Sequence, residues 1–248
     1  MPQRGLVGSR AVVERNYAIL PPQGIPESVL PEWRETAAHV LAAPAMGAEF
    51  AMYALDLAPG GGTSHGLPEG VEAFFYVIHG ECKLDLGGHA SPLGAGGFAN
   101  LHPGARFQLS AAGASRVLWL KKKYQAHDAR LPADVIGDEA EVKGEPFMGV
   151  AELLLKTLLP ADPVFDMAMN LFRFPPGYSL PVTETHFMEH GLYLLEGQGV
   201  YYLGDRWYEV EAGDFIWMGP YVPQSFFATG SEPARYIYYK NVNRDVTL

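Results

Sequence analysis

The sequence predicts an all-β protein built from two duplicated β-barrels, and three observations support this fold class. The first is composition: the 248 residues include 28 Gly and 20 Pro, and 12% are aromatic. The second is that short apolar segments alternate with turn residues, whereas amphipathic helix periodicity is largely absent. Together these features are typical of an all-β protein with many turns. The third observation is an internal repeat.

The two halves of the sequence align without gaps at a constant offset of 117 residues, as between Gly80 and Gly197. Most matched residues belong to turns or anchor strands, which is what a shared backbone geometry requires. The repeat unit of roughly 75 residues is longer than solenoid repeats, so we interpret the halves as two duplicated domains. The clearest matches join Pro59-Gly60 to Pro176-Gly177, Tyr76 to Tyr193, Leu86-Gly87 to Leu203-Gly204, Gly96 to Gly213 and Pro103 to Pro220.

Within the second copy the pattern predicts a meander of short strands separated by Gly-containing turns, as in a sandwich or barrel. The expected strands are Leu192–Leu195, Val200–Leu203, Arg206–Val210, Phe215–Met218 and Ala234–Lys240. The predicted organisation is an N-terminal arm (1–45), an N-terminal barrel (46–124), a linker (125–163) and a C-terminal barrel (164–248). In the linker, the apolar segment Ala151–Leu159 fits either a short helix or a buried strand, and periodicity does not decide between them.

Charge and cysteine content narrow the function classes. The net charge of −10 argues against a nucleic-acid partner. Cys82 is the only cysteine, so no intramolecular disulfide can form, which fits a reducing compartment. No apolar run is long enough to span a membrane, and the N-terminus has no signal-like core. We therefore expect a cytoplasmic protein, and the low charged fraction of 19% indicates a homo-oligomer.

The strongest functional signal is the stretch from Glu184 to His190. Glu184, His186 and His190 are separated by even numbers of residues, so one β-strand would direct all three side chains to the same face. One carboxylate and two imidazoles outline a site for a first-row metal. Gln224 offers a fourth ligand from another strand. The alternative interpretation is a cluster of surface polar residues.

The two copies differ at these positions. At the offset of 117, Glu184 corresponds to Leu67, His186 to Glu69, His190 to Ala73 and Gln224 to Phe107. Because Leu, Ala and Phe side chains cannot bind a metal, we expect a metal-free N-terminal barrel. Glu189 lies beside His190, but its odd spacing turns it to the other face and its match with Glu72 favours a structural role.

Two motifs in the second copy resemble those of the cupin family. The first runs from Gly177 through Glu184-x-His186-x-x-x-His190 to Gly197, and the second runs from Gly213-Asp214 to Gln224. Two such units form a bicupin. Among bicupins the chain resembles the (S)-ureidoglycine aminohydrolase family over nearly its whole length. Further segments that carry this resemblance are Arg10-Ala11-Val12-Val13, Pro44-Ala45-Met46-Gly47-Ala48, Phe165-Asp166-Met167 and Asn243-Arg244-Asp245.

This resemblance implies a hydrolase that releases ammonia from (S)-ureidoglycine and leaves ureidoglycolate. It also implies Mn²⁺ bound by the four residues named above, although the ligand types alone do not separate Mn²⁺ from other divalent first-row metals. A single carboxylate leaves such a site formally +1, which favours an anionic substrate. Tyr236, Tyr238 and Lys240 share one strand face by even spacing, so Lys240 can point into the same barrel. Lys240, Tyr201 and Tyr236 are the expected substrate contacts, and Lys240 either orients the substrate carboxylate or exchanges a proton.

Two other functions stay open at this point. One is another metal-dependent bicupin enzyme, such as an iron dioxygenase, although Gln224 departs from the His-rich ligand set of those enzymes. The other is a non-enzymatic ligand-binding bicupin, because a fold does not determine a function.

Overall fold

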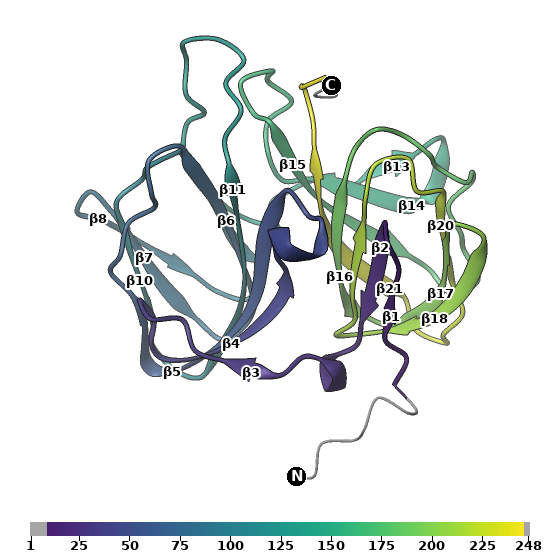
Figure 1. Ribbon diagram of the computed structural model, residues 1–248, viewed down its shortest axis with the longest axis horizontal. Helices are drawn as coiled ribbons and strands as arrows, with labels where there is room; N and C mark the ends of the chain where they lie inside the picture. The colour runs from purple at the N-terminus through teal and green to yellow at the C-terminus, as the bar shows by residue number, and fades with distance from the viewer. Residues whose placement is uncertain (1–8, 246–248) are drawn as a thin grey trace. The chain divides into compact units, whose positions relative to one another are not determined.

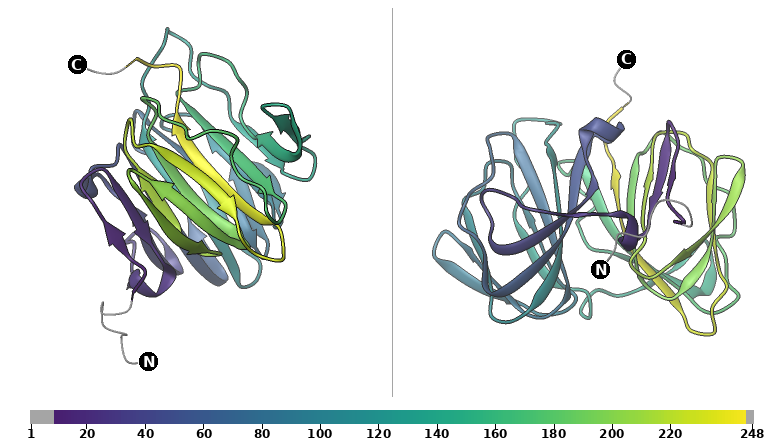
Figure 2. Two further views of the ribbon diagram at one scale, coloured as in Figure 1. Left: turned by 90° about the vertical axis from the view of Figure 1, so that its right-hand side faces the viewer. Right: turned by 60° about the horizontal axis from the view of Figure 1, so that its bottom comes forward.

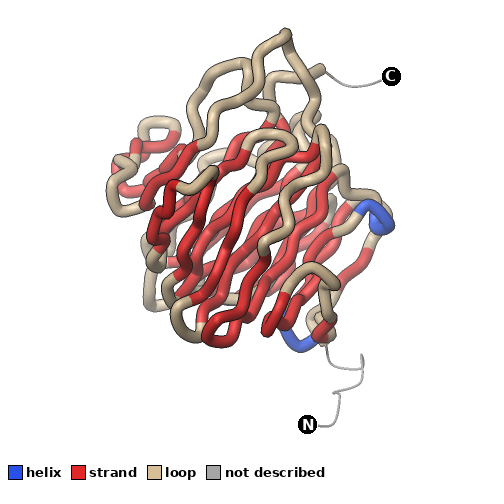
Figure 3. Tube along the Cα trace, turned by 90° about the vertical axis from the view of Figure 1, so that its left-hand side faces the viewer, coloured by secondary structure: helices blue, strands red, loops and turns tan. Residues whose placement is uncertain are grey.

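The computed structural model describes residues 9–245 (Figure 1). In this part of the chain there are 21 strands and two single-turn 3-10 helices, so the fold is all-β as predicted (Figure 3). Neither helix has the length or the apolar character needed to cross a membrane. The chain divides into two compact units, which we call the C-terminal unit and the N-terminal unit.

The N-terminal unit contains Pro26–Val142 and Asp162–Asp166. Its ten strands form one antiparallel sheet in the order β12-β9-β6-β11-β5-β10-β7-β8, with β4 paired to β5 and β3 to β4. They are β3 (Glu27–Ser28), β4 (Arg34–Ala42), β5 (Phe50–Thr63), β6 (Val71–His79), β7 (Cys82–Leu86), β8 (His89–Leu93), β9 (Gly97–Leu101), β10 (Phe107–Ala111), β11 (Ser115–Lys123) and β12 (Val135–Asp138), and helix η2 spans Pro44–Met46.

Strand β5 links the two parts of this sheet, since its first half pairs with β11 and its end pairs with β10. At the end of β5 the backbone of Gly62 lies so close to β10 that an added Cβ would be 1.9 Å from the carbonyl oxygen of Leu109. Gly62 also has φ +146°, so glycine is required there for two independent reasons.

Among the described residues, the C-terminal unit contains 9–25, Lys143–Ala161 and 167–245. It has an eight-stranded sheet, β1-β2-β19-β16-β21-β15-β14-β13, and a three-stranded sheet, β18-β17-β20 (Figure 2). The strands are β1 (Val12–Val13), β2 (Tyr17–Leu20), β13 (Glu145–Phe147), β14 (Val150–Thr157), β15 (Met167–Phe174), β16 (His190–Glu196), β17 (Gln198–Leu203), β18 (Arg206–Glu211), β19 (Phe215–Met218), β20 (Gln224–Ala228) and β21 (Ala234–Asn241), and helix η1 spans Pro22–Gly24.

The predicted meander and the predicted repeat both appear in these strands. At the offset of 117, β10 corresponds residue for residue to β20, and β8 corresponds to the first five residues of β18. The open question about Ala151–Leu159 is also answered, because most of this segment lies in strand β14. Strand is favoured there because β14 pairs with β13 on one side and β15 on the other.

The unit boundaries differ from the predicted domain boundaries at both connecting segments. The predicted arm is divided, because β2 pairs with β19 of the C-terminal unit whereas β3 and β4 belong to the N-terminal unit. Arg10 anchors the first part, donating two hydrogen bonds to the buried Asp214 carboxylate at 2.5 and 3.0 Å. The predicted linker is not a free connection, because it contains β12, β13 and β14.

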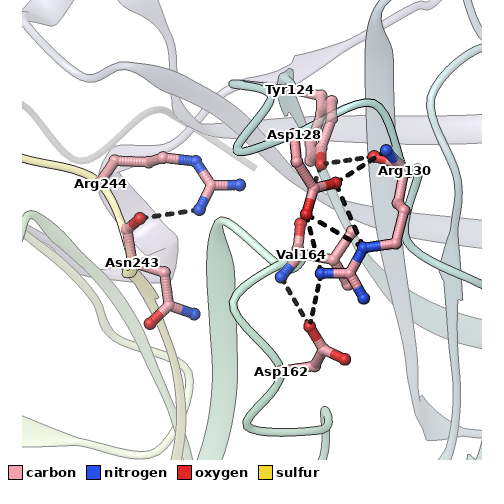
Figure 4. Close-up of polar contacts among 7 residues, drawn as sticks. All are labelled: Tyr124, Asp128, Arg130, Asp162, Val164, Asn243 and Arg244. Carbon is pink, nitrogen blue, oxygen red and sulfur yellow. Dashed lines mark hydrogen bonds and ion pairs between the residues drawn. The ribbon is translucent and has the colours of Figure 1, made fainter.

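The segment Asp162–Asp166, which begins at the end of the predicted linker, is attached to the rest of the N-terminal unit by polar contacts (Figure 4). The Tyr124 hydroxyl donates to the carbonyl oxygen of Val164 at 2.9 Å, and Arg130 lies 3.8 Å from Asp162. These contacts explain why a five-residue segment so late in the chain belongs to the earlier unit.

Apolar side chains fill the interior of each barrel, but the N-terminal interior is the more completely apolar one. Leu67, Ala73 and Phe107 are all buried in its core, and the Phe107 ring lies 5.4 Å from that of Phe75. These are the positions that correspond to Glu184, His190 and Gln224 in the other copy. The same backbone framework therefore encloses apolar residues in one unit and polar residues in the other.

Candidate active site

The candidate site begins at an isolated β-bridge between Glu184 and Gln224. The Glu184 amide donates to the Gln224 carbonyl oxygen at 2.8 Å, and the Gln224 amide donates back to Glu184 at 2.9 Å. A residue pair that exchanges both backbone hydrogen bonds lies directly opposite, so its two side chains project to the same side. Glu184 and Gln224 accordingly line one interior cavity.

A loop and the start of β16 bring the two histidines to the site, whereas we predicted one continuous strand. Glu184, His186 and His190 do not lie on one continuous strand, because the segment between the bridge and β16 is a loop. His190 is the first residue of β16, and the loop returns His186 to within 4.8 Å of it, measured between ring centroids. The loop is held where the Tyr221 amide donates to the carbonyl oxygen of His186 at 2.8 Å.

Strand β21 brings Lys240 to the same site. Lys240 is the direct cross-strand partner of His190 on β16, and it is half-buried. Tyr236 and Tyr238 precede it at even spacing on β21, so all three share one strand face. Both tyrosines line the cavity together with His190.

Tyr201 occupies a specific place in this arrangement. Its buried hydroxyl donates to Oε1 of Gln224 at 2.7 Å, and the substrate contact expected for this residue stays a prediction. An amide oxygen accepts two hydrogen bonds or ligand interactions. The contact with Tyr201 therefore orients the Gln224 amide and still leaves its oxygen with one free lone pair.

Burial controls the electrostatics of the site. Burial raises the pKa of the Glu184 carboxyl, while the positive charge of Lys240 lowers it. Burial lowers the pKa of both His186 and His190, which favours the neutral imidazoles that a metal ligand requires. Burial also lowers the pKa of Lys240, and Glu184 partly opposes this shift. Burial raises the pKa of Tyr201 and Tyr236 far enough for both hydroxyls to keep their protons.

The donor set fits a divalent first-row metal. Two oxygen and two nitrogen donors without a thiolate suit Mn²⁺ or Fe²⁺. Nδ1 of His186 is buried and has no hydrogen-bond partner within residues 9–245, and such an orphaned nitrogen is costly unless a ligand satisfies it. As the side chains stand, however, no three His, Cys, Asp or Glu groups in this part of the chain are spaced to hold a metal ion. Binding would therefore require Glu184, His186 and His190 to close around the ion.

Glu189, for which we predicted a structural role, faces away from this set. Its buried carboxylate accepts a hydrogen bond from the indole nitrogen of Trp217 at 2.7 Å, and its backbone amide donates to the side chain of Asn241. These contacts join the residue that precedes β16 to β19 and β21.

Three residues of the cavity wall were not among the predicted site residues, although Tyr238 was expected on the face of Lys240: they are Phe172, Leu192 and Tyr238. Strand parity is the signal that points to them. Leu192 follows His190 by two residues, Tyr238 precedes Lys240 by two, and Phe172 pairs with Tyr236 across β15 and β21.

The comparisons with known proteins agree with this architecture. The cupin domain family matches residues 170–239, which contain Glu184, His186, His190 and Gln224 and end one residue before Lys240. The chain is 36% identical to (S)-ureidoglycine aminohydrolase from Escherichia coli, over 98% of this chain and 95% of that protein. It is 34% identical to the Arabidopsis thaliana protein of the same name, over 96% of this chain and 79% of that one.

A solved structure also resembles the whole chain. The crystal structure of the protein Ylba from Escherichia coli matches with a TM-score of 0.87 and 34% identity, and the match covers 98% of both chains. Identity above 30% over almost the full length, with the site strands included, places this protein in a family. The chain belongs to the (S)-ureidoglycine aminohydrolase family of cupin proteins.

Proposed function

We propose that this protein hydrolyses (S)-ureidoglycine to ammonia and (S)-ureidoglycolate. The observation that carries the proposal is family membership over 98% of the chain, combined with a buried polar site in the matched cupin domain. The C-terminal unit brings carboxylate, imidazole, amide and amine groups to one cavity region. Groups of this kind suit a small polar substrate.

We further propose that Glu184, His186, His190 and Gln224 hold a divalent metal, with Mn²⁺ as the expected ion. When bound, the metal would supply Lewis-acid polarisation and a fixed anchor for the substrate. The donor chemistry and the orphaned His186 nitrogen support this assignment. Since Glu184 contributes the only carboxylate of the set, an occupied site has a formal charge of +1 and favours an anionic substrate.

Lys240 is the proposed catalytic residue. The carbon–nitrogen bond to the substrate ammonium breaks and ammonia leaves, while the lone pair of the ureido nitrogen forms a C=N bond. Water then adds to this carbon, the C=N electron pair returns to the ureido nitrogen, and water loses one proton. The burial that lowers the pKa of Lys240 favours a neutral amine that accepts this proton and passes it to the released ammonia, which becomes ammonium.

The test measures ammonia release from freshly generated (S)-ureidoglycine by metal-stripped protein, with and without added Mn²⁺. We expect release that depends on Mn²⁺ and is lost in Glu184→Ala. A matched control is Glu152→Ala, which removes an exposed carboxylate from β14 of the same unit. Absence of release at full metal loading would overturn the proposed substrate, whereas oxygen consumption would indicate a dioxygenase instead.

A further inference from the structure

A polar pair lies in the C-terminal barrel next to the cross-strand pair of Lys240 and His190, two residues away along the same face of β21. Asn170 of β15 and Tyr238 of β21 are cross-strand partners, and Tyr238 pairs on its other side with Leu192 of β16. The next row of the same face consists of Phe172, Tyr236 and Leu194. Asn170 therefore places an amide where the barrel interior becomes mainly aromatic and aliphatic.

Packing holds the Tyr238 ring in one position. Its centroid lies 5.9 Å from that of Phe172, with an interplanar angle of 9°, and 5.7 Å from that of His190. The side chain is buried, with an exposed fraction of 8%, and lines the cavity that contains Glu184 and Gln224. Aromatic packing on two sides leaves the hydroxyl little freedom except rotation of its proton.

Asn170 bonds to this hydroxyl through its side chain. The Asn170 side-chain amide carries two N–H donors, and the oxygen of a tyrosine hydroxyl can accept one of them. A tyrosine hydroxyl has a single proton to donate. When the Asn170 amide donates to this oxygen, that proton is available to an acceptor in the cavity.

We propose that the Tyr238 hydroxyl is a further substrate-binding donor and that Asn170 is the positioning residue that directs its proton into the site. This inference rests on the proposed function. Its acceptor is the carbonyl oxygen of the ureido group. Lys240 lies nearer the surface and exchanges its proton at the reacting carbon, and the deeper, neutral hydroxyl is matched to the neutral acceptor at the other end of the substrate.

The experiment uses N-carbamoylglycine, which has the carboxylate and the ureido group of the substrate but lacks the amino group that leaves. Its binding to the Mn²⁺-loaded protein is measured by calorimetry, together with metal content and thermal midpoint. Tyr238→Phe keeps the ring and its packing, and we expect about three- to tenfold weaker binding from the loss of one hydrogen bond. Tyr202→Phe, which removes a hydroxyl from β17 outside the cavity wall, is the matched control.

Asn170→Asp tests the direction of the bond. A carboxylate of the same shape only accepts hydrogen bonds, so it would capture the Tyr238 proton and weaken analogue binding as much as Tyr238→Phe does. Asn170→Ala frees the hydroxyl without capturing its proton, so we expect a smaller loss. KM for (S)-ureidoglycine should rise in these variants in the same order as the loss of analogue binding, and their metal content should be unchanged. If Asn170→Asp does not fold, Tyr238→Phe still tests the hydroxyl as a donor and Asn170→Ala still tests the contribution of Asn170.

Wild-type turnover together with unchanged analogue binding in Tyr238→Phe would overturn this inference alone. Asn170→Asp with wild-type analogue affinity would overturn the positioning role of Asn170. A metal-loaded wild-type protein that neither binds N-carbamoylglycine nor releases ammonia would overturn the proposed function as well.

Discussion

Glu184 and Gln224 exchange both backbone hydrogen bonds across an isolated bridge, and this bridge holds two of the four proposed metal ligands opposite each other. Tyr201 supports this pair, because its hydroxyl donates a hydrogen bond to the Gln224 side chain. The backbone therefore sets the distance between the two ligands, and a side-chain hydrogen bond sets the orientation of one of them.

Tyr201→Phe should weaken metal binding without removing a ligand. The change deletes the hydrogen bond at 2.7 Å that orients the Gln224 amide, and loss of such a supporting contact typically costs 10- to 100-fold in metal affinity or activity. Titration of metal-stripped protein with Mn²⁺ measures the effect. Tyr202→Phe on the same strand is the control. Equal affinities of Tyr201→Phe and wild type would show that Gln224 needs no such support.

Lys240→Met should abolish turnover and leave the metal bound. Methionine keeps much of the lysine stem volume but provides neither a charge nor a proton acceptor, and loss of a general base typically lowers the rate at least about 100-fold. Ammonia release and metal content are measured on the same sample. Lys143→Met removes an exposed lysine of the same unit and should change neither. Near-normal turnover in Lys240→Met would eliminate the proposed catalytic role.

Tyr221→Val should loosen the loop that carries His186. Tyr221 has φ +63°, its amide donates to the His186 carbonyl oxygen, and its own carbonyl oxygen accepts from Thr185 at 3.1 Å. A β-branched residue is strongly disfavoured at positive φ, so we expect a loss of about 1–2 kcal/mol in the free energy of unfolding and weaker metal binding. Tyr221→Asn tolerates this backbone conformation and should keep both properties. A loss of the same size in both variants would instead implicate the tyrosine ring.

A buried ion cluster in the N-terminal unit should make stability depend on pH. The Lys122 amine lies 3.2 Å from Glu72 and 2.5 Å from Asp166, and all three residues are buried. Burial and a hydrogen bond with Asp166 raise the pKa of Glu72 from 4.5 to about 9, although Lys122 opposes the shift. Folded Glu72 therefore keeps a proton that the unfolded chain releases, so its contribution to stability falls as the pH rises from 4.5 to about 9.

Glu72→Gln tests this linkage, because glutamine keeps the shape of the protonated acid but does not titrate. The variant should have a flatter dependence of the free energy of unfolding on pH across that window, measured by urea denaturation at several pH values. Glu69→Gln, at an exposed position in the same unit, should keep the wild-type slope. An unchanged slope in Glu72→Gln would mean that another group accounts for the dependence.

Local patterns in the sequence were sufficient to predict the strands and the duplication. Turn residues separate many of these strands, so the Gly positions repeated at an offset of 117 located matching strands in both copies. Strand parity also identified Tyr236 and Lys240 as residues of one face, and the comparison of Glu184 with Leu67 distinguished the polar barrel from the apolar one. These properties depend on residues close together in the chain or on direct comparison of the copies.

The remaining features of the site depend on pairing between strands that are far apart in the sequence. No spacing within the sequence indicates that Glu184 forms a bridge with Gln224, that His190 lies opposite Lys240, or that Asn170 lies opposite Tyr238. The even spacing from Glu184 to His190 predicted one continuous strand. The middle of this segment is instead a loop, which a hydrogen bond from the Tyr221 amide holds in place. Register between distant strands is set by the collective packing of side chains on both faces of a sheet, and that packing exists only in the folded chain.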